Sequence, residues 1–526
     1  MRFISVLTIA SALFISTYSF AQDHQHGSDS HLVTITNPQP LMAQAIRLKE
    51  ALSYLGSPLS PADEKALETL QKQPLTVETA NKIQEILDPY CIAFVDINPE
   101  SRVKVEKGPA KAQLIQNGWT SFLVKVKNDA GGTAELKVES PNALPRTHVN
   151  SYASRVLKEH IITKGEVENR FLEAHMYTGK PLQKNLTGFK LEYAVVQLYT
   201  SDRDQRQVKL GFNVGQGTQD VGFRNTTHIL FDIKPSVKVK LRVKDVDGTP
   251  AMAAFTITDS IQRMSGKLAA MYPLPSRRVA DFDEYPDFFF QKHIYRNDGE
   301  HVMLAPGKYL FIYTRGPEYI PQKKIIEIPT GVDSVTFSFE LKRWINMAKL
   351  GWFSGDHHVH AAGCSHYDSP AEGVKPSAMW RQALGEDLNI SALLTWGPSW
   401  YHQKNYFTGK IDSLSDKKHL MRYDVEVSGF PSSHAGHIVL LGLKEDDYPG
   451  TTKIEDWPTW TGPVLKWAKS QGGATGYAHS GFGLEPVTPT TELPNYILPK
   501  MDGIGANEYV VTVTQGLVDF YSVGNT

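Results

Sequence analysis

The spacing of hydrophobic residues changes twice along the chain. Between residues 41 and 87 they recur at helical spacing in three segments, "LMAQAIRLKEALSYLG", "SPADEKALETLQ" and "TVETANKIQEIL". Ser60 and Thr76 stand where an N-cap is expected, and Pro61 takes the first helical position. The pattern predicts three short helices within a helical segment, residues 41–90.

From residue 102 onward, hydrophobic and polar residues alternate, which is typical of strands. Examples are "TSFLVKVKND", "KLEYAVVQLYTSD", "THILFDIK" and "GKYLFIYTRG", while residues 152–180 look helical or irregular. Asp247-Gly248 is a hairpin signal. We expect a β-rich, sandwich-like domain over residues 91–235 and a second sandwich over 236–345. The stretch "VKDVDGTPAMAAFTITD" with "LAPGKYLFIYTRG" resembles the carboxypeptidase-regulatory or prealbumin-like sandwich. No catalytic constellation is found in residues 32–345.

After residue 346, predicted strands alternate with helices. "SAMWRQALGEDL" and "TGPVLKWAKSQG" read as helices, and "NISALLTW", "YDVEVSGF", "HIVLLGL", "ATGYAH" and "DGIGANEY" as strands. This order predicts an α/β unit over residues 346–526, barrel-like in form. Functional residues of such folds lie at the carboxyl ends of strands.

The first 21 residues have the features of a secretory signal peptide. Arg2 precedes a short apolar run, and Ser19-Phe20-Ala21 is a small-x-small cleavage signal. A buried core helix is the alternative. Residues 22–40 then form a flexible leader, and no later segment is apolar enough to span a bilayer. We expect a secreted or periplasmic protein.

Size and charge narrow the choice of partners. The chain has 526 residues, which favours two to four domains, and a net charge of -1. A net charge this close to zero argues against non-specific electrostatic binding to nucleic acid or anionic lipid. The two cysteines, Cys91 and Cys364, fall in different predicted domains, so we do not expect them to pair. The oligomeric state is left open.

Histidines concentrate in the last third of the chain, which holds nine of the eighteen. His358 and His360 are two apart and would share one face of a strand, so both imidazoles can reach one ion. Asp356 shares that face as a ligand or an orienting carboxylate. The competing interpretation is a polar loop that happens to be rich in histidine.

Three further residues extend this candidate metal set. Glu426 lies between two valines in a predicted strand and would face away from them, towards either a site or solvent. His437 begins the next strand, as a ligand or a strand cap, and His479 ends a strand before a glycine-rich loop.

Three motifs in this order resemble the PHP superfamily of metallohydrolases, the polymerase-and-histidinol-phosphatase group. "GDHHVH" is similar to its D-x-H-x-H motif, "VEVSGF…GHIVLLGL" to its glutamate and Gly-His strands, and "GYAHSG" to its Ala-His-Pro loop, with Ser480 in place of proline. The nearest branch is the secreted, carbaryl-hydrolase-like one.

The resemblance implies a distorted (β/α) barrel and a metal site. His358 and His360 would bind one metal, Glu426 would bridge two, and His437 and His479 would complete the set. The ions would be one to three of Zn²⁺, Mn²⁺ or Fe. They would activate water to hydrolyse an ester, amide, carbamate or phosphoester bond in a small-molecule or glycan-like substrate.

The chain departs from the family pattern in two places. Trp396-Gly397 replaces an expected Asp-His pair, and His402 in the same loop could substitute for it as a catalytic group. Trp396, Trp400 and Tyr401 would then line an aromatic mouth or simply pack within the loop. The family's last aspartate-containing turn is missing, so we expect a truncated, incomplete barrel.

Several nearby residues allow more than one interpretation. Cys364 and His366 could bind metal or shape the pocket, and Glu508 could face substrate or be structural. Arg381 and Lys404 are the nearest candidates for a phosphate clamp. Two functions compete: an exported metal-dependent hydrolase, and a non-catalytic cell-envelope binding module with a degenerate PHP-like domain.

Overall fold

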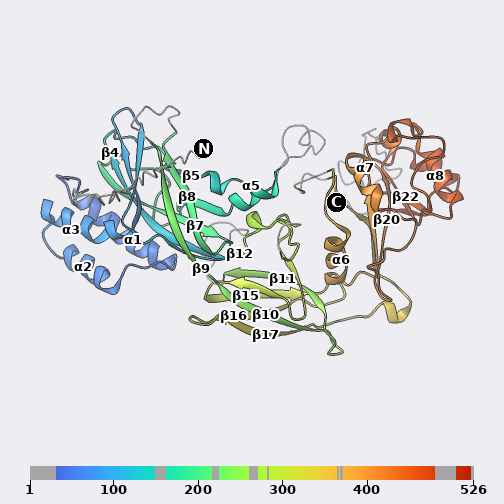
Figure 1. The fold of residues 1–526 in the computed structure, drawn as a ribbon, viewed down its shortest axis with the longest axis horizontal. Helices are drawn as coiled ribbons and strands as arrows, with labels where there is room; N and C mark the ends of the chain where they lie inside the picture. The colour runs from blue at the N-terminus through green and yellow to red at the C-terminus, as the bar shows by residue number, and fades with distance from the viewer. Residues whose placement is uncertain are drawn as a thin grey trace, which may run out of the picture.

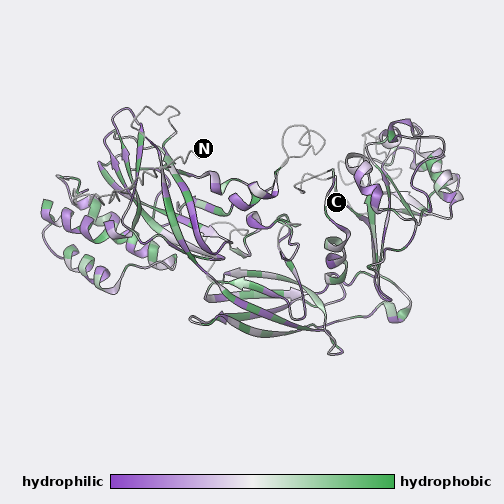
Figure 2. Cartoon of the chain, in the orientation of Figure 1, coloured by the Kyte–Doolittle hydropathy of each residue, from purple (hydrophilic) through white to green (hydrophobic). Residues whose placement is uncertain are grey.

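The chain is a multidomain, mostly β protein with several curled sheets and short helices (Figure 1). The computed structural model describes residues 31–147, 162–215, 224–259, 270–280, 284–363, 367, 371–479 and 505–522. The predicted signal peptide and the start of the leader lie outside these residues. In both sandwich regions, hydrophobic and polar positions alternate along the strands (Figure 2).

Three helices precede the first sheet, as predicted: α1 Gln39–Tyr54, α2 Pro61–Gln71 and α3 Val77–Leu87. The Ser60 side chain accepts a hydrogen bond from Asp63 N, and that of Thr76 accepts one from Thr79 N, so both predicted N-caps are present. The helices bury a row of leucines, with Leu48 fully enclosed, against Leu123 and Val195 of the sheet.

The first sandwich packs two sheets face to face. One has the strand order β2-β1-β4-β7-β6 and the other β3-β9-β8-β5. In chain order the strands are β1 Cys91–Ile97, β2 Val103–Lys107, β3 Gln113–Ile115, β4 Gly118–Asn128, β5 Lys137–Glu139, β6 Leu172–Met176, β7 Leu191–Thr200, β8 Asp204–Asn213 and β9 Thr226–Lys234. Their inner faces share one hydrophobic core, which includes Phe122, Phe212 and Phe231.

Part of the stretch predicted to be helical or irregular is different in the structure. Short helix α5 (Lys164–Asn169) is followed by strand β6, which pairs with β7. The β6 sequence, "LEAHM", contains no β-branched residue and gave no strand signal; pairing with the hydrophobic strand β7 decides its conformation. The rest of that stretch before residue 162 lies outside the described residues.

The strands of the second sandwich lie between residues 237 and 340, and Arg343, just after the last strand, forms a bridge with Tyr319 of the same domain. Its sheets have the orders β14-β10-β17 and β12-β11-β15-β16, with β13 also paired to β11. The strands are β10 Val237–Lys244, β11 Met252–Asp259, β12 Met271–Tyr272, β13 Ile294–Asn297, β14 His301–Leu304, β15 Gly307–Thr314, β16 Gln322–Ile328 and β17 Ser334–Glu340.

The Asp247-Gly248 turn forms, but it does not make a regular hairpin. Gly248 has φ +80°, as the tight turn requires. The strands on either side, β10 and β11, belong to different sheets, and their main chains pair at the isolated Lys244–Pro250 bridge. The turn is local, whereas sheet membership depends on distant strands.

The last region contains a six-stranded mixed sheet in the order β18-β19-β20-β21-β22-β23. The strands are β18 Gly355–Val359, β19 Ile390–Thr395, β20 Leu420–Val427, β21 Ile438–Leu441, β22 Ala474–Tyr477 and β23 Phe520–Tyr521. β18, β19 and β20 are parallel, and β21 is antiparallel to both β20 and β22. Helices α6 (Pro376–Gly385) and α8 (Thr461–Ser470) share hydrophobic cores with β20.

The described strands form an open ladder that curls on itself. On β18, the His357 ring lies 5.1 Å from the Phe520 ring of β23, and its Nε2 is 3.2 Å from Ser522 Oγ. First and last strands thus meet through side chains, without a strand pairing among the described residues. A closed (β/α) barrel remains a prediction. Within the described ranges, no helix has the length and apolarity to cross a membrane.

The predicted strand "DGIGANEY" is wrong where it is described. Residues 505–507 are irregular, and Glu508 precedes helix α9 (Tyr509–Thr514). The Glu508 carboxylate accepts hydrogen bonds from Thr461 N and Thr461 Oγ1 at the start of α8. This polar contact holds the segment against α8.

The helical layer gives a test of packing. Leu48→Ala should lower the free energy of unfolding of the N-terminal region by about 2–5 kcal/mol, because Leu48 has no exposed surface. Leu75→Ala is the control, since Leu75 is 37% exposed. Urea unfolding measures both, and equal losses would contradict the packing described here.

Candidate metal centre

The Glu426 carboxylate is buried on the face of the sheet that points away from α8. Its neighbours Val425 and Val427 pack into the hydrophobic core with α8, so the alternation of the strand turns Glu426 the other way. The predicted orientation is confirmed. Glu426 is 1% exposed and faces histidines, not solvent.

His358 and His360 reach one oxygen of this carboxylate. Their Nε2 atoms lie 3.2 and 2.7 Å from Glu426 Oε2, and 2.9 Å from each other. His358 belongs to β18 and His360 directly follows it, so the spacing of two places both rings on one face.

His437 and His479 approach the other oxygen. His437 Nδ1 and His479 Nε2 lie 3.5 and 3.7 Å from Glu426 Oε1. Strand register brings them there: Val427 pairs with Ile438, Ile438 with Tyr477, and Ala478 N donates to His437 O. His437 immediately precedes β21, and because β21 runs antiparallel to β20 and β22, it lies at the edge where those two strands end.

The four histidines change the pKa of the Glu426 carboxyl group. Burial alone would raise the pKa of Glu426, but the contacts with His358, His360, His437 and His479 hold it well below its usual range. The carboxylate is therefore ionised, and the surrounding imidazoles compensate its charge.

The donor set fits a divalent metal. Ligand atoms of His358, Glu426 and His479 all lie within 4.8 Å of one another. A tetrahedral zinc ion with bonds of about 2.05 Å separates its ligand atoms by about 3.3 Å, close to the spacings among His358, His360 and Glu426. His437 Nδ1 is buried and, apart from its 3.5 Å approach to Glu426 Oε1, has no hydrogen-bond partner among the described residues, so it is available to an ion.

The two other predicted catalytic residues are not in this cluster. Asp356 is exposed, and its carboxylate accepts a hydrogen bond from His358 N (3.0 Å), so it supports the backbone of the H-x-H segment. His402 lies in α7 (Trp400–Gln403) with its ring against Tyr406, and no described contact joins it to Glu426. Cys364 and His366 lie outside the described residues.

Of the three aromatic residues predicted near the site, only Trp396 has a described contact with a histidine of the cluster. The Trp396 ring lies against the His360 ring with centroids 4.4 Å apart and planes tilted by 38°, and its Nε1 donates to Ala362 O (2.6 Å). Trp400 is 1% exposed and packs in the core against Phe430 and Trp457, so of the two alternatives the packing one holds for it. Tyr401 is exposed and donates to Glu455.

The candidate phosphate clamps have other partners. Arg381 forms a two-pronged ion pair with Glu300 of the second sandwich, and Lys404 pairs with Asp447. Ser428 is a neighbour that the sequence analysis missed: its Oγ lies 3.5 Å from His437 Nε2. Its position two residues after Glu426 was the available signal.

Comparisons with known proteins leave the family open. No family model and no curated protein matches the chain. Among solved structures, similarity is found to BcpA, the major pilin subunit of Bacillus cereus, with 10% identity and a TM-score of 0.15 over 48% of this chain and 67% of that one. For the Bacillus anthracis TIE protein the identity is 9% and the TM-score 0.13, over 59% of this chain and 56% of that one. For a streptococcal ancillary pilin the identity is 11% and the TM-score 0.14, over 48% of this chain and 62% of that one. Such TM-scores support no inference about fold or function.

Trp396 gives a prediction about the metal site. Trp396→Ala should weaken metal binding about 10-fold or more, because the His360 ring would lose the surface that orients it. Trp396→Phe should stay much closer to wild type. Competition with a chromogenic chelator measures the affinity, and an unchanged value for the alanine variant would contradict this role.

Proposed function

We propose that the chain is an exported metal-dependent hydrolase whose centre is Glu426 with His358, His360, His437 and His479. The observation that carries this proposal is the buried Glu426 carboxylate, which four imidazoles from three segments approach. Export is inferred from the predicted signal peptide.

Each oxygen of the Glu426 carboxylate has its own pair of histidines, which supports a role in bridging two ions. Oε2 is approached by His358 and His360, and Oε1 by His437 and His479. Two ions sharing this carboxylate would each have two imidazoles. This agrees with the ligand set implied by the resemblance to the PHP superfamily, with Zn²⁺, Mn²⁺ or Fe as the candidate ions.

The chemistry follows from what the residues can hold. When bound, such an ion lowers the pKa of a water molecule and polarises a carbonyl or phosphoryl oxygen. The four histidines and Glu426 would bind and orient the ion, and the Trp396 ring beside His360 would offer an aromatic contact to a substrate. Because Arg381 and Lys404 are paired elsewhere, we favour an ester, amide or carbamate over a phosphoester.

A non-catalytic envelope module is the second candidate. The observation that favours it is Trp396, which replaces an expected Asp-His pair and covers one face of His360. Such a protein would bind metal but would not hydrolyse esters, carbamates or phosphoesters.

Metal content tests the common basis of both candidates. Purified wild type should hold at least one equivalent of Zn²⁺, Mn²⁺ or Fe by elemental analysis, and His358→Ala/His360→Ala should lose most of it. His434→Ala is a matched control, because His434 is exposed and bonded to Pro431 O. A metal-free wild type would rule out the proposed centre.

Hydrolysis separates the two candidates. Metal-loaded wild type should cleave some members of a panel of aryl esters, carbamates and phosphoesters, and lose this activity after chelation. Readdition of metal should restore it in wild type, not in Glu426→Gln, which lacks the negative charge. Full metal loading without turnover of any substrate would favour the binding module.

A further inference from the structure

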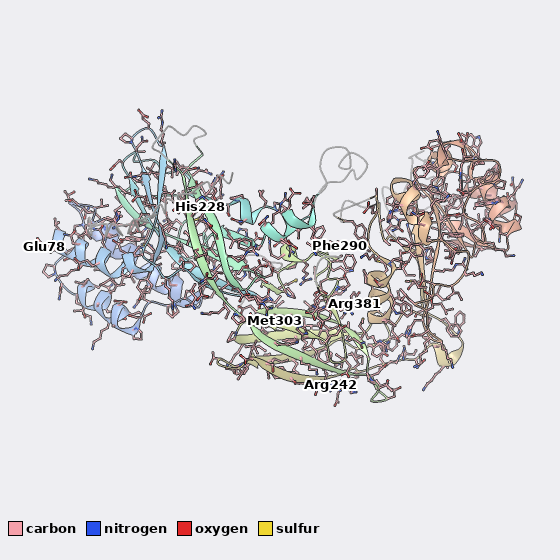
Figure 3. All side chains as sticks on the ribbon, viewed as in Figure 1. Glu78, His228, Arg242, Phe290, Met303 and Arg381 are labelled. Atoms are coloured by element: carbon pink, nitrogen blue, oxygen red, sulfur yellow. The ribbon has the colours of Figure 1, made fainter. Side chains whose placement is uncertain are left out.

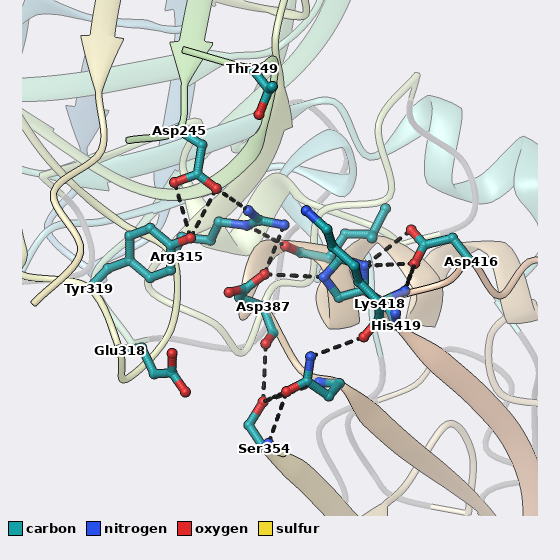
Figure 4. A network of polar contacts seen from close by, with 12 residues as sticks. Asp245, Thr249, Arg315, Glu318, Tyr319, Ser354, Asp387, Asp416, Lys418 and His419 are labelled. Atoms are coloured by element: carbon teal, nitrogen blue, oxygen red, sulfur yellow. Dashed lines mark hydrogen bonds and ion pairs between the residues drawn. The ribbon is translucent and has the colours of Figure 1, made fainter. Parts of the chain in front are cut away.

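The parallel strands that lead to the metal centre begin at a partly buried polar network (Figure 4), at the edge of the sheet opposite the centre. Ser354, Asn389 and His419 immediately precede β18, β19 and β20, respectively. These strands end near His360, Trp396 and Glu426.

Hydrogen bonds tie the three starting points together. Asn389 Oδ1 accepts from Ser354 N (3.0 Å), and Asn389 Nδ2 donates to Lys418 O (3.0 Å). Ser354 Oγ donates to Asp387 O (3.1 Å). Asp387 has φ +51°, which is rare outside glycine, so its surroundings fix an otherwise unfavourable conformation.

The Asp387 carboxylate joins this network to the second sandwich. Arg315 Nη2 lies 3.0 Å from Asp387 Oδ1, and Arg343 Nη2 donates to Asp387 Oδ2. Arg315 also pairs with Asp245 (2.8 Å), and Arg343 with Glu318 (2.9 Å). Side chains of Asp387 and Arg315 are only 12% and 11% exposed, so solvent screens this pair weakly.

Helix α6 adds a close-packed contact beside this junction. The Tyr295 hydroxyl of β13 donates to Glu386 (2.6 Å), and a Cβ at Gly385 would collide with the Tyr295 ring. Arg381 of α6 lies at the same boundary (Figure 3), where its guanidinium pairs with Glu300. The surfaces of the sandwich and of α6 are therefore fitted to each other.

His419 supplies a titratable group in this junction. Its ring is 7% exposed, with Nε2 3.1 Å from Asp387 and Nδ1 3.1 Å from Asp416. On the side of α6 it faces the Trp380 ring at 6.3 Å. Its carboxylate partners are Asp387 and Asp416, and the adjacent Lys418 is a further cation (Figure 4). Asp387 in turn pairs with Arg315 and Arg343.

We infer that the second sandwich and the metal-site sheet unfold together, as one cooperative unit, because Asp387 couples them. We also infer that protonated His419 strengthens this junction. Asp387 is thus a positioning residue for the strands that carry the centre. The inference does not depend on the proposed hydrolase function, since it concerns the opposite end of the strands.

The pKa shifts of His419 and Asp387 give the direction in which the stability of the junction changes with pH. Although burial lowers the pKa of His419, its hydrogen bonds to Asp387 and Asp416 raise it above the ordinary value. The stabilisation is therefore complete below about pH 6.5 and is lost as the pH rises through the higher, folded-state pKa. The pKa of Asp387 is lowered by His419, Arg315 and Arg343 despite burial, so its contribution is lost only in acid.

Hydrogen exchange of the full chain, read by mass spectrometry, tests the inference. Protection factors in β15 and β20 should fall together between pH 6 and pH 9 in wild type. In His419→Gln they should be low already at pH 6 and change little with pH. Asp387→Asn should lower protection in both strands about 10-fold or more, because it removes the charge that Arg315 and Arg343 share.

The matched control is His228→Gln, an exposed histidine on β9 of the first sandwich (Figure 3). It should retain the wild-type pH dependence. The inference is overturned if Asp387→Asn lowers protection in only one of the two strands. It is also overturned if His419→Gln keeps the wild-type pH dependence.

Discussion

The structure of the last third of the chain is organised around the burial of one negative charge. A carboxylate as enclosed as that of Glu426 is costly unless it is compensated by cations or hydrogen bonds. Four histidines provide this compensation, and none of them is near Glu426 in sequence except His437. The parallel pairing of β18 to β20 and the reversal at β21 are what bring the five side chains to one edge.

The opposite ends of the same strands show how that arrangement is held. A metal centre functions only if its ligands are fixed to within a fraction of an ångström, which requires rigid supporting elements. Here the supports are ion pairs and hydrogen bonds around Asp387, reaching from the starts of the site strands to Arg315 and Arg343 of the second sandwich. The second sandwich is thus part of the framework of the centre.

Much of this could be predicted from local sequence. The alternation around Glu426 predicts its face, the H-x-H spacing predicts that His358 and His360 act together, and Ser60 and Thr76 identify helix starts. These features depend on a few neighbouring residues. The misses are non-local: Asp247-Gly248 makes a turn, but its strands enter different sheets, and Glu508 caps a helix distant in sequence. The ring contact between Trp396 and His360 and the network around Asp387 join segments that the sequence does not link.

Anomalous X-ray diffraction from crystals grown with Zn²⁺ is the most direct test of the centre. The account predicts an anomalous peak about 2.0–2.2 Å from Glu426 Oε2 and from the Nε2 atoms of His358 and His360. A second peak on the Oε1 side would support a bridging carboxylate. Crystals with no peak beside Glu426, or with zinc bound only elsewhere, would contradict the account.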